Sequence, residues 1–221
     1  MFEFWSVNNI AFKVLGYPMS YVEFLGTIFS LWSVWLISER KILTWPVGIV
    51  NVLLYMVLFY QIGLYSDTIE QVYYLGTSIY GWWRWSTPES VNGKIANVRY
   101  SSRHTIFLTA LVTIVISLAT GIFMSQIHLI LPTIFPEKAS FPYLDALTTI
   151  MSFTAMWLMT QKRIESWYYW IVVDIIGIWL YYVKQVKFVA LLYVILLFMA
   201  INGSRSWLKT VKLAKSQTFR N

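Results

Sequence analysis

The sequence has few charged residues and no cysteine. Only 12% of its 221 residues are Asp, Glu, Lys or Arg, whereas 58% are hydrophobic, and soluble domains carry roughly 25% charged residues. Most of the chain therefore cannot face water, which excludes a soluble globular protein. The lack of Cys excludes a disulfide framework and thiolate metal ligands, and two His residues are too few for a metal cluster. We expect neither a metal nor a cofactor.

Motifs for phosphate binding and catalysis are also missing. The sequence has no Gly-rich phosphate loop, no Ser-His-Asp spacing and no paired His with a carboxylate. Coupling to ATP is therefore not expected, and neither is an enzyme: His128 stands alone, whereas intramembrane catalysis needs acids or His clustered at one depth. The net charge of +7 does not predict a nucleic-acid partner, because the basic residues lie between apolar runs rather than in one stripe.

Seven apolar runs are long enough to cross a membrane. A helix needs about 20 mostly apolar residues to span the bilayer, and helix is required because lipid offers no partners to open backbone groups. We predict an all-α integral membrane protein whose partner is the lipid bilayer. The third run is the weakest, because it carries Glu70 and Arg84. The predicted spans are 21–38, 45–62, 68–85, 105–131, 143–160, 167–183 and 188–204.

The first residues predict a different kind of element. Residues 1–16 mix apolar side chains such as Phe4 and Trp5 with polar ones such as Lys13. This mixture favours a short helix lying in the membrane interface. Pro18 is expected to end it.

The distribution of Lys and Arg predicts the orientation, because positive charge is retained on the cytoplasmic side. With the N-terminus outside, 13 basic residues fall on the inner side and 4 on the outer side, namely Lys13, Lys138, Lys184 and Lys187. The split predicts an outer N-terminus and a cytoplasmic C-terminus. This arrangement needs an odd number of spans, which agrees with seven.

The chain contains an internal repeat. At an offset of 122 residues, 21–85 aligns with 143–207 without a gap, and 18 of the 65 positions are identical. Each unit holds three spans, so one further span between them is needed to give both units the same direction. We therefore predict two parallel three-helix repeats around one linker helix (3+1+3), with a substrate site at mid-depth between them. The predicted domains are 1–20 (interfacial helix), 21–85 (first repeat), 86–142 (linker), 143–207 (second repeat) and 208–221 (basic cytoplasmic tail).

The sixth predicted span carries the strongest candidate site. Trp167, Trp170 and Asp174 lie at i, i+3 and i+7, hence on one helical face. Two aromatic planes and one carboxylate suit a flat cationic ligand. The alternative is that the two Trp residues form an interfacial belt and that Asp174 bonds a neighbouring helix. Asp174 lies too deep for a belt, which favours the binding site.

Further candidates lie in other spans. Asn51 is one position out of register with Asp174 in the repeat, and Gln71 aligns with Tyr193, so both members of that pair are expected to point inward. Each amide is either a ligand contact or a hydrogen bond between helices. Asn202 and the repeat-matched Trp35 are weaker candidates, for which packing is the safer interpretation.

Three stretches of the sequence resemble the PnuC vitamin transporters. They are WPVGIVNVLLYMVLFYQIGLYSD at 45–67, IEQVYYLGTSIYGWWRW at 69–85 and ESWYYWIVVDIIGIWLYYVK at 165–184. The last contains the W-x-x-W spacing and the acid at Asp174. The resemblance extends from Tyr21 to Trp207.

The resemblance implies a seven-helix fold similar to a full-length SWEET carrier, assembled as a homotrimer in a bacterial inner membrane. It implies facilitated diffusion of nicotinamide riboside, a flat pyridinium cation, followed by phosphorylation in the cytosol, which traps the substrate. Relatives carrying thiamine, riboflavin or deoxynucleosides leave other substrates open, thiamine above all because it is also a flat cation. A heptahelical receptor that binds without transport is the alternative from another class.

Overall fold

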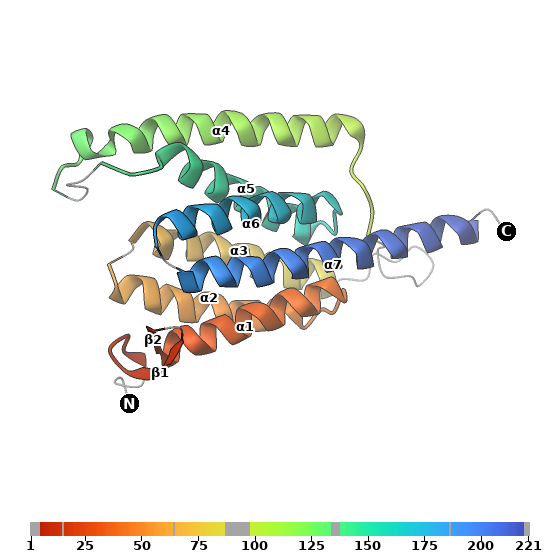
Figure 1. Cartoon of the computed structure of the whole chain (residues 1–221). Coiled ribbons are helices and arrows are strands. Elements are labelled where there is room, and N and C mark those ends of the chain that lie inside the picture. Colours follow the sequence, from red (N-terminus) through yellow and green to blue (C-terminus); the bar gives the residue numbers. More distant parts are fainter. Residues whose placement is uncertain are drawn as a thin grey trace.

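The predicted spans are all helices. The computed structural model describes residues 5–14, 16–63, 65–86, 98–133, 138–185 and 187–218. In this part of the chain, five helices are long and apolar enough to cross a membrane, namely α1, α2, α4, α6 and α7, and the less apolar α3 and α5 run beside them (Figure 1). The helices are α1 Tyr21–Ser38, α2 Thr44–Gln61, α3 Tyr65–Ser86, α4 Arg103–Ile130, α5 Pro142–Thr160, α6 Glu165–Val183 and α7 Lys187–Thr218.

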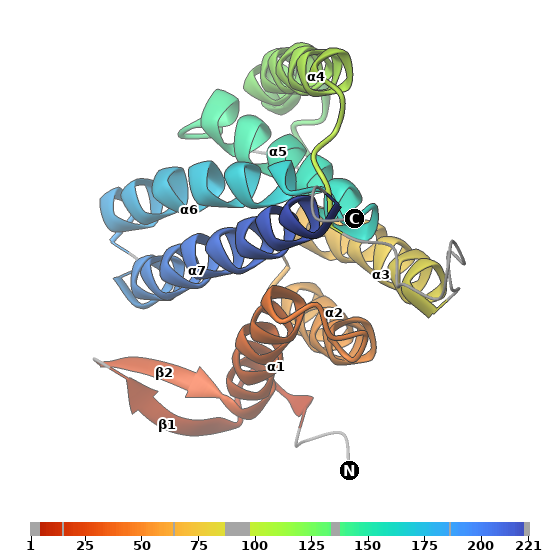
Figure 2. The same ribbon diagram turned by 90° about the vertical axis from the view of Figure 1, so that its right-hand side faces the viewer.

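Six of the helices form a ring. Successive contacts join α1 to α2, α2 to α3, α3 to α5, α5 to α6, α6 to α7 and α7 back to α1. The linker helix α4 packs mainly against α5 and lies at the edge of the molecule, as Figure 2 shows. In Figure 1, α1 and α5 start at the same end of the bundle and run in the same direction. The linker helix is therefore placed outside the ring, where its apolar surface is available to lipid.

The N-terminal segment corrects one prediction. Within the described residues of 1–20 there is no interfacial helix but a β-hairpin, in which β1 (Ile10–Val14) pairs antiparallel with β2 (Tyr17–Ser20). Gly16 between the strands has a φ of +85°, which glycine adopts without strain and which allows a tight turn. Pro18 is tolerated because β2 is an edge strand that pairs with β1 on one side only. Its missing N–H therefore removes no hydrogen bond to another neighbouring strand. Residues 1–4, also part of the predicted helix, lie outside the described residues.

The hairpin is fixed to the first helices. Gln61 at the end of α2 donates from Nε2 to the carbonyl of Trp5 (2.7 Å) and accepts from the backbone N–H of Val7 (2.9 Å). The Tyr17 hydroxyl donates to Oε1 of Glu23 (2.9 Å). Burial and the Glu23 carboxylate raise the pKa of Tyr17 to about 12, so the phenol stays protonated at neutral pH. We call the end of the bundle that carries this hairpin the hairpin end.

Two tryptophans pack over glycines at the opposite end. A Cβ on Gly81 of α3 would lie 2.5 Å from the ring of Trp45, and a Cβ on Gly203 of α7 would overlap the ring of Trp167. Only glycine permits this approach. Trp45 and Trp167 are both 1% exposed, so the two contacts form the most buried part of the core.

Two more tryptophans join the halves of the ring at the same end. The indole Nε1 of Trp85 in α3 donates to the carbonyl of Thr160 at the end of α5 (3.1 Å). The indole Nε1 of Trp207 in α7 donates to the carbonyl of Ile37 at the end of α1 (3.1 Å). Each half therefore donates one indole hydrogen bond to a carbonyl at the end of a helix in the other half.

The helix ends repeat the same backbone geometry. Arg40 after α1 and Lys162 after α5 both have positive φ, 58° and 54°, which is the left-handed conformation that ends many helices. Gly63 after α2 and Gln185 after α6 also have positive φ, 76° and 62°. In both pairs the residues lie 122 residues apart, the offset of the sequence repeat. The last helix runs on to Thr218, so it includes most of the predicted tail at 208–221.

The packing over Gly203 leads to a stability prediction. Replacing Gly203 with Ala places a methyl group inside the Trp167 ring and should lower the free energy of unfolding by about 1–3 kcal/mol, as overpacking does. Gly76→Ala is the matched control, because nothing lies within 4 Å of its Cβ position. Thermal unfolding in detergent should show a lower melting temperature for Gly203→Ala but not for Gly76→Ala. Equal melting temperatures would contradict this packing.

Candidate substrate site

A buried carboxylate without a partner lies at mid-depth in the bundle. Asp174, halfway along α6, is 3% exposed. Among the described residues it has no hydrogen-bond or ion-pair partner, and burial alone acts on it. Burying an unpaired carboxylate is costly, and a cation nearby offsets that cost. The arrangement favours a positively charged ligand that comes from outside the chain.

Tyrosines line the neighbourhood of Asp174. The ring of Tyr193 in α7 packs on Gly177, one turn from Asp174, where a Cβ would lie 2.5 Å from the ring. Tyr193 also stacks on Tyr181, with 5.3 Å between ring centroids and an interplanar angle of 21°. It lies within electrostatic range of both Asp174 and Tyr74. Of these three tyrosines, only Tyr193 lies close to the carboxylate of Asp174, and its ring connects that carboxylate with Tyr181 towards the hairpin end.

The two tryptophans of the predicted face have different surroundings. Trp167 is enclosed by Gly203 and by Trp207, whose ring lies 5.5 Å away and edge-on at 90°. The ring packs tightly in this conformation, but its indole Nε1 has no hydrogen-bond partner among the described residues, so a ligand contact at Trp167 stays a prediction. Trp170 is half-buried and borders that cluster. It lies one turn before Asp174 on the same helical face, so a ligand at Asp174 is within its reach.

The first half of the ring contributes polar groups. The Oδ1 atom of Asn51 in α2 is buried and has no hydrogen-bond partner among the described residues. Gln71 in α3 is 7% exposed, and its Nε2 makes only a 3.5 Å contact with the carbonyl of Asp67. An unpaired carbonyl oxygen and a weakly held amide leave hydrogen-bonding capacity for a ligand.

Two predicted candidates do not join this group. Asn202 is exposed on α7. Trp35 is 47% exposed, and the ammonium of Lys41 lies 4.6 Å from the centroid of its ring. Both side chains face the surroundings of the monomer, which favours the packing interpretation given above for these two residues.

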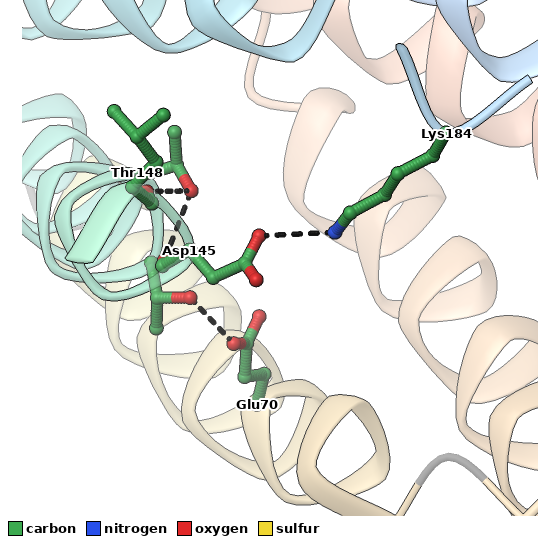
Figure 3. A network of polar contacts seen from close by, with 6 residues as sticks. Glu70, Asp145, Thr148 and Lys184 are labelled. Atoms are coloured by element: carbon green, nitrogen blue, oxygen red, sulfur yellow. Dashed lines mark hydrogen bonds and ion pairs between the residues drawn. The ribbon is translucent and has the colours of Figure 1, made fainter. Parts of the chain in front are cut away.

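A second polar group lies at the hairpin end, and Figure 3 shows it. Thr149 of α5 donates to Oε1 of Glu70 in α3 (2.9 Å). Lys184, after α6, pairs with Oδ1 of Asp145 (3.3 Å). Thr148 donates back to the carbonyls of Leu144 and Asp145 within α5. Both Glu70 and Asp145 lie within predicted spans, but the sequence gives no sign that Lys184 pairs with Asp145.

A cavity of about 580 Å³ lies elsewhere, between the end of α4 and the start of α5. Gln126, His128, Lys138 and Tyr143 border it. None of the candidate residues lines this cavity. The predicted site and this peripheral hollow are therefore separate features.

The fold and the buried polar groups define the class of this protein. Apolar helices that surround an unpaired carboxylate and an unpaired amide oxygen near mid-depth are characteristic of multi-pass membrane transporters.

Comparison with known proteins gives the family. The sequence profile of the family described as "Nicotinamide mononucleotide transporter" matches residues 20–209. The nicotinamide riboside transporter PnuC of Escherichia coli K12 is 30% identical, with 95% of this chain and 96% of that protein covered. This chain belongs to the PnuC family of membrane transporters. The expected family is thereby confirmed.

Other relatives show the breadth of the family. The riboflavin/roseoflavin transporter RibM of Streptomyces davaonensis is 25% identical, with 91% of each chain covered. The crystal structure of a vitamin B3 transporter PnuC superimposes with a TM-score of 0.62 at 22% identity, covering 85% of this chain and 80% of that one. That structure confirms the fold.

The unpaired amide of Asn51 leads to a binding prediction. Asn51→Ala should weaken ligand binding by about 1 kcal/mol, roughly fivefold, because one hydrogen bond is lost. Asn202→Ala is the matched control, since that amide is exposed, and it should bind as the wild type does. Quenching of tryptophan fluorescence by nicotinamide riboside measures both. If Asn202→Ala weakened binding and Asn51→Ala did not, the site would lie on the exposed face of α7 instead.

Proposed function

We propose that this protein carries nicotinamide riboside across a bacterial inner membrane by facilitated diffusion. The observation that carries the proposal is Asp174, a buried carboxylate that lacks a partner within the described chain. The pyridinium ring of the riboside supplies the missing positive charge, and Trp170, which is half-buried, supplies a face on which that ring can stack. The relative from Escherichia coli bears the same substrate in its name.

The charge around Asp174 favours a nucleoside over a nucleotide. The phosphate of a mononucleotide needs a basic partner. No cation acts on Asp174 within the described residues. A phosphate next to this carboxylate would be repelled, so the mononucleotide in the family description suits this site less well than the riboside.

Charge also separates the riboside from riboflavin, the substrate in the name of RibM. The ring system of riboflavin is neutral and would leave Asp174 unpaired. Thiamine is a flat cation and fits the carboxylate equally well, so thiamine is the second candidate. A receptor that binds without transport is less well supported, because the relatives are named as transporters.

The transport mechanism follows from the repeat. We propose that α1–α3 and α5–α7 are two parallel units of a 3+1+3 arrangement similar to a full-length SWEET carrier, with all seven helices spanning the membrane. The matched Trp–Gly contacts and the positive φ values at the same 122-residue offset support this arrangement. Alternating access then consists of rocking the two units around Asp174.

The orientation and assembly belong to the same proposal. The hairpin end faces the outside, and the C-terminal part of α7, with Arg205, Lys209 and Lys212, faces the cytoplasm, as the positive-inside rule predicts. The resemblance supports a homotrimer and trapping by cytosolic phosphorylation.

Two substitutions test the site. Asp174→Asn and Trp170→Ala should each weaken riboside binding by about 1 kcal/mol or more, through loss of the countercharge and of a stacking surface. Trp35→Ala is the control, because that ring is exposed. Binding is measured in detergent, and transport is measured as counterflow in liposomes.

Each outcome has a clear meaning. Wild-type affinity in folded Asp174→Asn and Trp170→Ala would refute the site. Counterflow that responds to unlabelled thiamine but ignores unlabelled riboside would keep the transporter and replace its substrate.

A further inference from the structure

Lys184 occupies a cation site made by the protein itself. Its ammonium lies 3.3 Å from Oδ1 of Asp145 in α5 and 5.9 Å from the ring centroid of Tyr181 in α6. A carboxylate on one side and an aromatic face on the other are the groups that bind organic cations. The Lys184 side chain thus shows that this position accepts a positive charge (Figure 3).

The surroundings of Lys184 are rich in negative charge. Asp67 and Asp145 both act electrostatically on Glu70, and all three carboxylates act on Tyr181. Clustered charges of one sign concentrate counterions of the other sign. Among the described residues, Lys184 pairs directly with Asp145 alone, and the other two carboxyl groups lie close enough to add to the negative potential at the same position.

The pair of Lys184 with Asp145 is easily exchanged. The two side chains are 34% and 43% exposed, and ion pairs open to water contribute little to stability. The ammonium is therefore held loosely, as a displaceable group should be. A permanent structural pair would be expected to be buried and to have further hydrogen bonds.

The position of this group connects it with Asp174. Lys184 lies ten residues after Asp174, about 15 Å further along the axis of α6 towards the hairpin end. Tyr193 lies within electrostatic range of both Asp174 and Glu70, so it lies between the central carboxylate and the acidic group at the hairpin end. Asp174 is itself buried and unpaired, which is a second observation that favours a cation deeper in the bundle.

We propose that Asp145, Glu70 and Tyr181 form an outer cation station at which Lys184 is a tethered competitor that the cationic substrate displaces on its way to Asp174. A pyridinium ring that displaces Lys184 gains the same carboxylate and the same aromatic face. A neutral nucleoside gains neither. The outer station therefore selects substrates by charge before they reach the central site. This inference rests on the proposed function, in which the substrate is a cation.

Opposite effects of two substitutions test the station. Asp145→Asn should lower kcat/KM for uptake of nicotinamide riboside by about fivefold, the order expected for loss of a partly exposed ion pair. Lys184→Met should instead lower the KM, because the competing ammonium is gone. Lys187→Met, also exposed in the same turn region, is the matched control and should leave uptake unchanged.

An uncharged substrate provides the second comparison. Dihydronicotinamide riboside has the same ribose and ring size but no positive charge. Wild-type protein should carry it more slowly, because it leaves Asp174 unpaired, and that slower uptake should change by less than about twofold in either variant. If Asp145 and Lys184 form a structural pair, both substitutions should impair uptake of both forms in the same direction. That result overturns the proposal.

The absence of native cysteine allows a direct measurement that does not depend on transport. In Lys184→Cys, a quaternary-ammonium methanethiosulfonate should react faster than a neutral one, after each rate is normalised to that of a free thiol. Asp145→Asn in the same background should remove the difference, and the riboside should protect the thiol. Equal normalised rates in Lys184→Cys refute the station even if a variant transports poorly.

The two proposals fail in different ways. If wild-type protein does not transport the riboside, the proposed substrate is wrong, and the labelling experiment still decides on the station with the cationic reagent as the probe. If wild-type protein transports the riboside but Asp145→Asn and Lys184→Met change uptake in the same direction, only the station is wrong.

Discussion

The contact of two indole rings with two glycines fixes the rest of the bundle. Trp45 on Gly81 and Trp167 on Gly203 hold α2 against α3 and α6 against α7 at the end opposite the hairpin. Trp85 and Trp207 then donate across to the helix ends of the other half. In a bilayer these indole N–H groups and the terminal carbonyls have no water to bond with. The exchange satisfies both sets of groups and ties the two halves together at this end.

The halves meet differently at the hairpin end. There the contacts between α3 and α5 are polar and partly exposed, for example the hydrogen bond from Thr149 to Glu70. Tyr73 adds a bond from its hydroxyl to the carbonyl of Phe153 in the middle of the same interface (2.8 Å). Such contacts exchange with water or a ligand more easily than a dry cluster of tryptophans. In this conformation the hairpin end is therefore the more easily opened end, whereas release at the other side in the proposed mechanism requires the tryptophan contacts to separate.

The sequence predicted the helices well because length and apolar composition decide which segments can cross a bilayer. The parallel repeat stays a prediction, although the Trp–Gly contacts and the positive φ values recur at the offset that the sequence indicated. The N-terminal segment was assigned wrongly as a helix, because short mixed sequences carry no strong periodicity and the turn at Gly16 was not weighted. Pro18 was taken only as a helix end, although it also fits an edge strand.

The site was harder to predict, because composition does not show which side of a helix faces inward. Trp167 was proposed as a ligand contact, yet its match with Trp45 and the match of Gly203 with Gly81 already indicated symmetric packing. Asn202 precedes Gly203, so it points about 100° away from the Trp167 contact and ends up exposed. Lys184 was assigned only to an outer turn, since its partner Asp145 lies 39 residues away in another helix.

The departures from symmetry identify where an asymmetric ligand fits. Asp174 corresponds to Val52 across the repeat, and Trp170 corresponds to Gly48, so the charge and the large ring occur in only one half. The other half offers the unpaired oxygen of Asn51 near the same depth. A nucleoside with a cationic ring at one end and ribose hydroxyls at the other needs this division, because a symmetric pair of carboxylates would leave one of them without a partner. In the proposed mechanism, the repeat supplies two similar units for rocking, and the few residues that differ between them supply recognition.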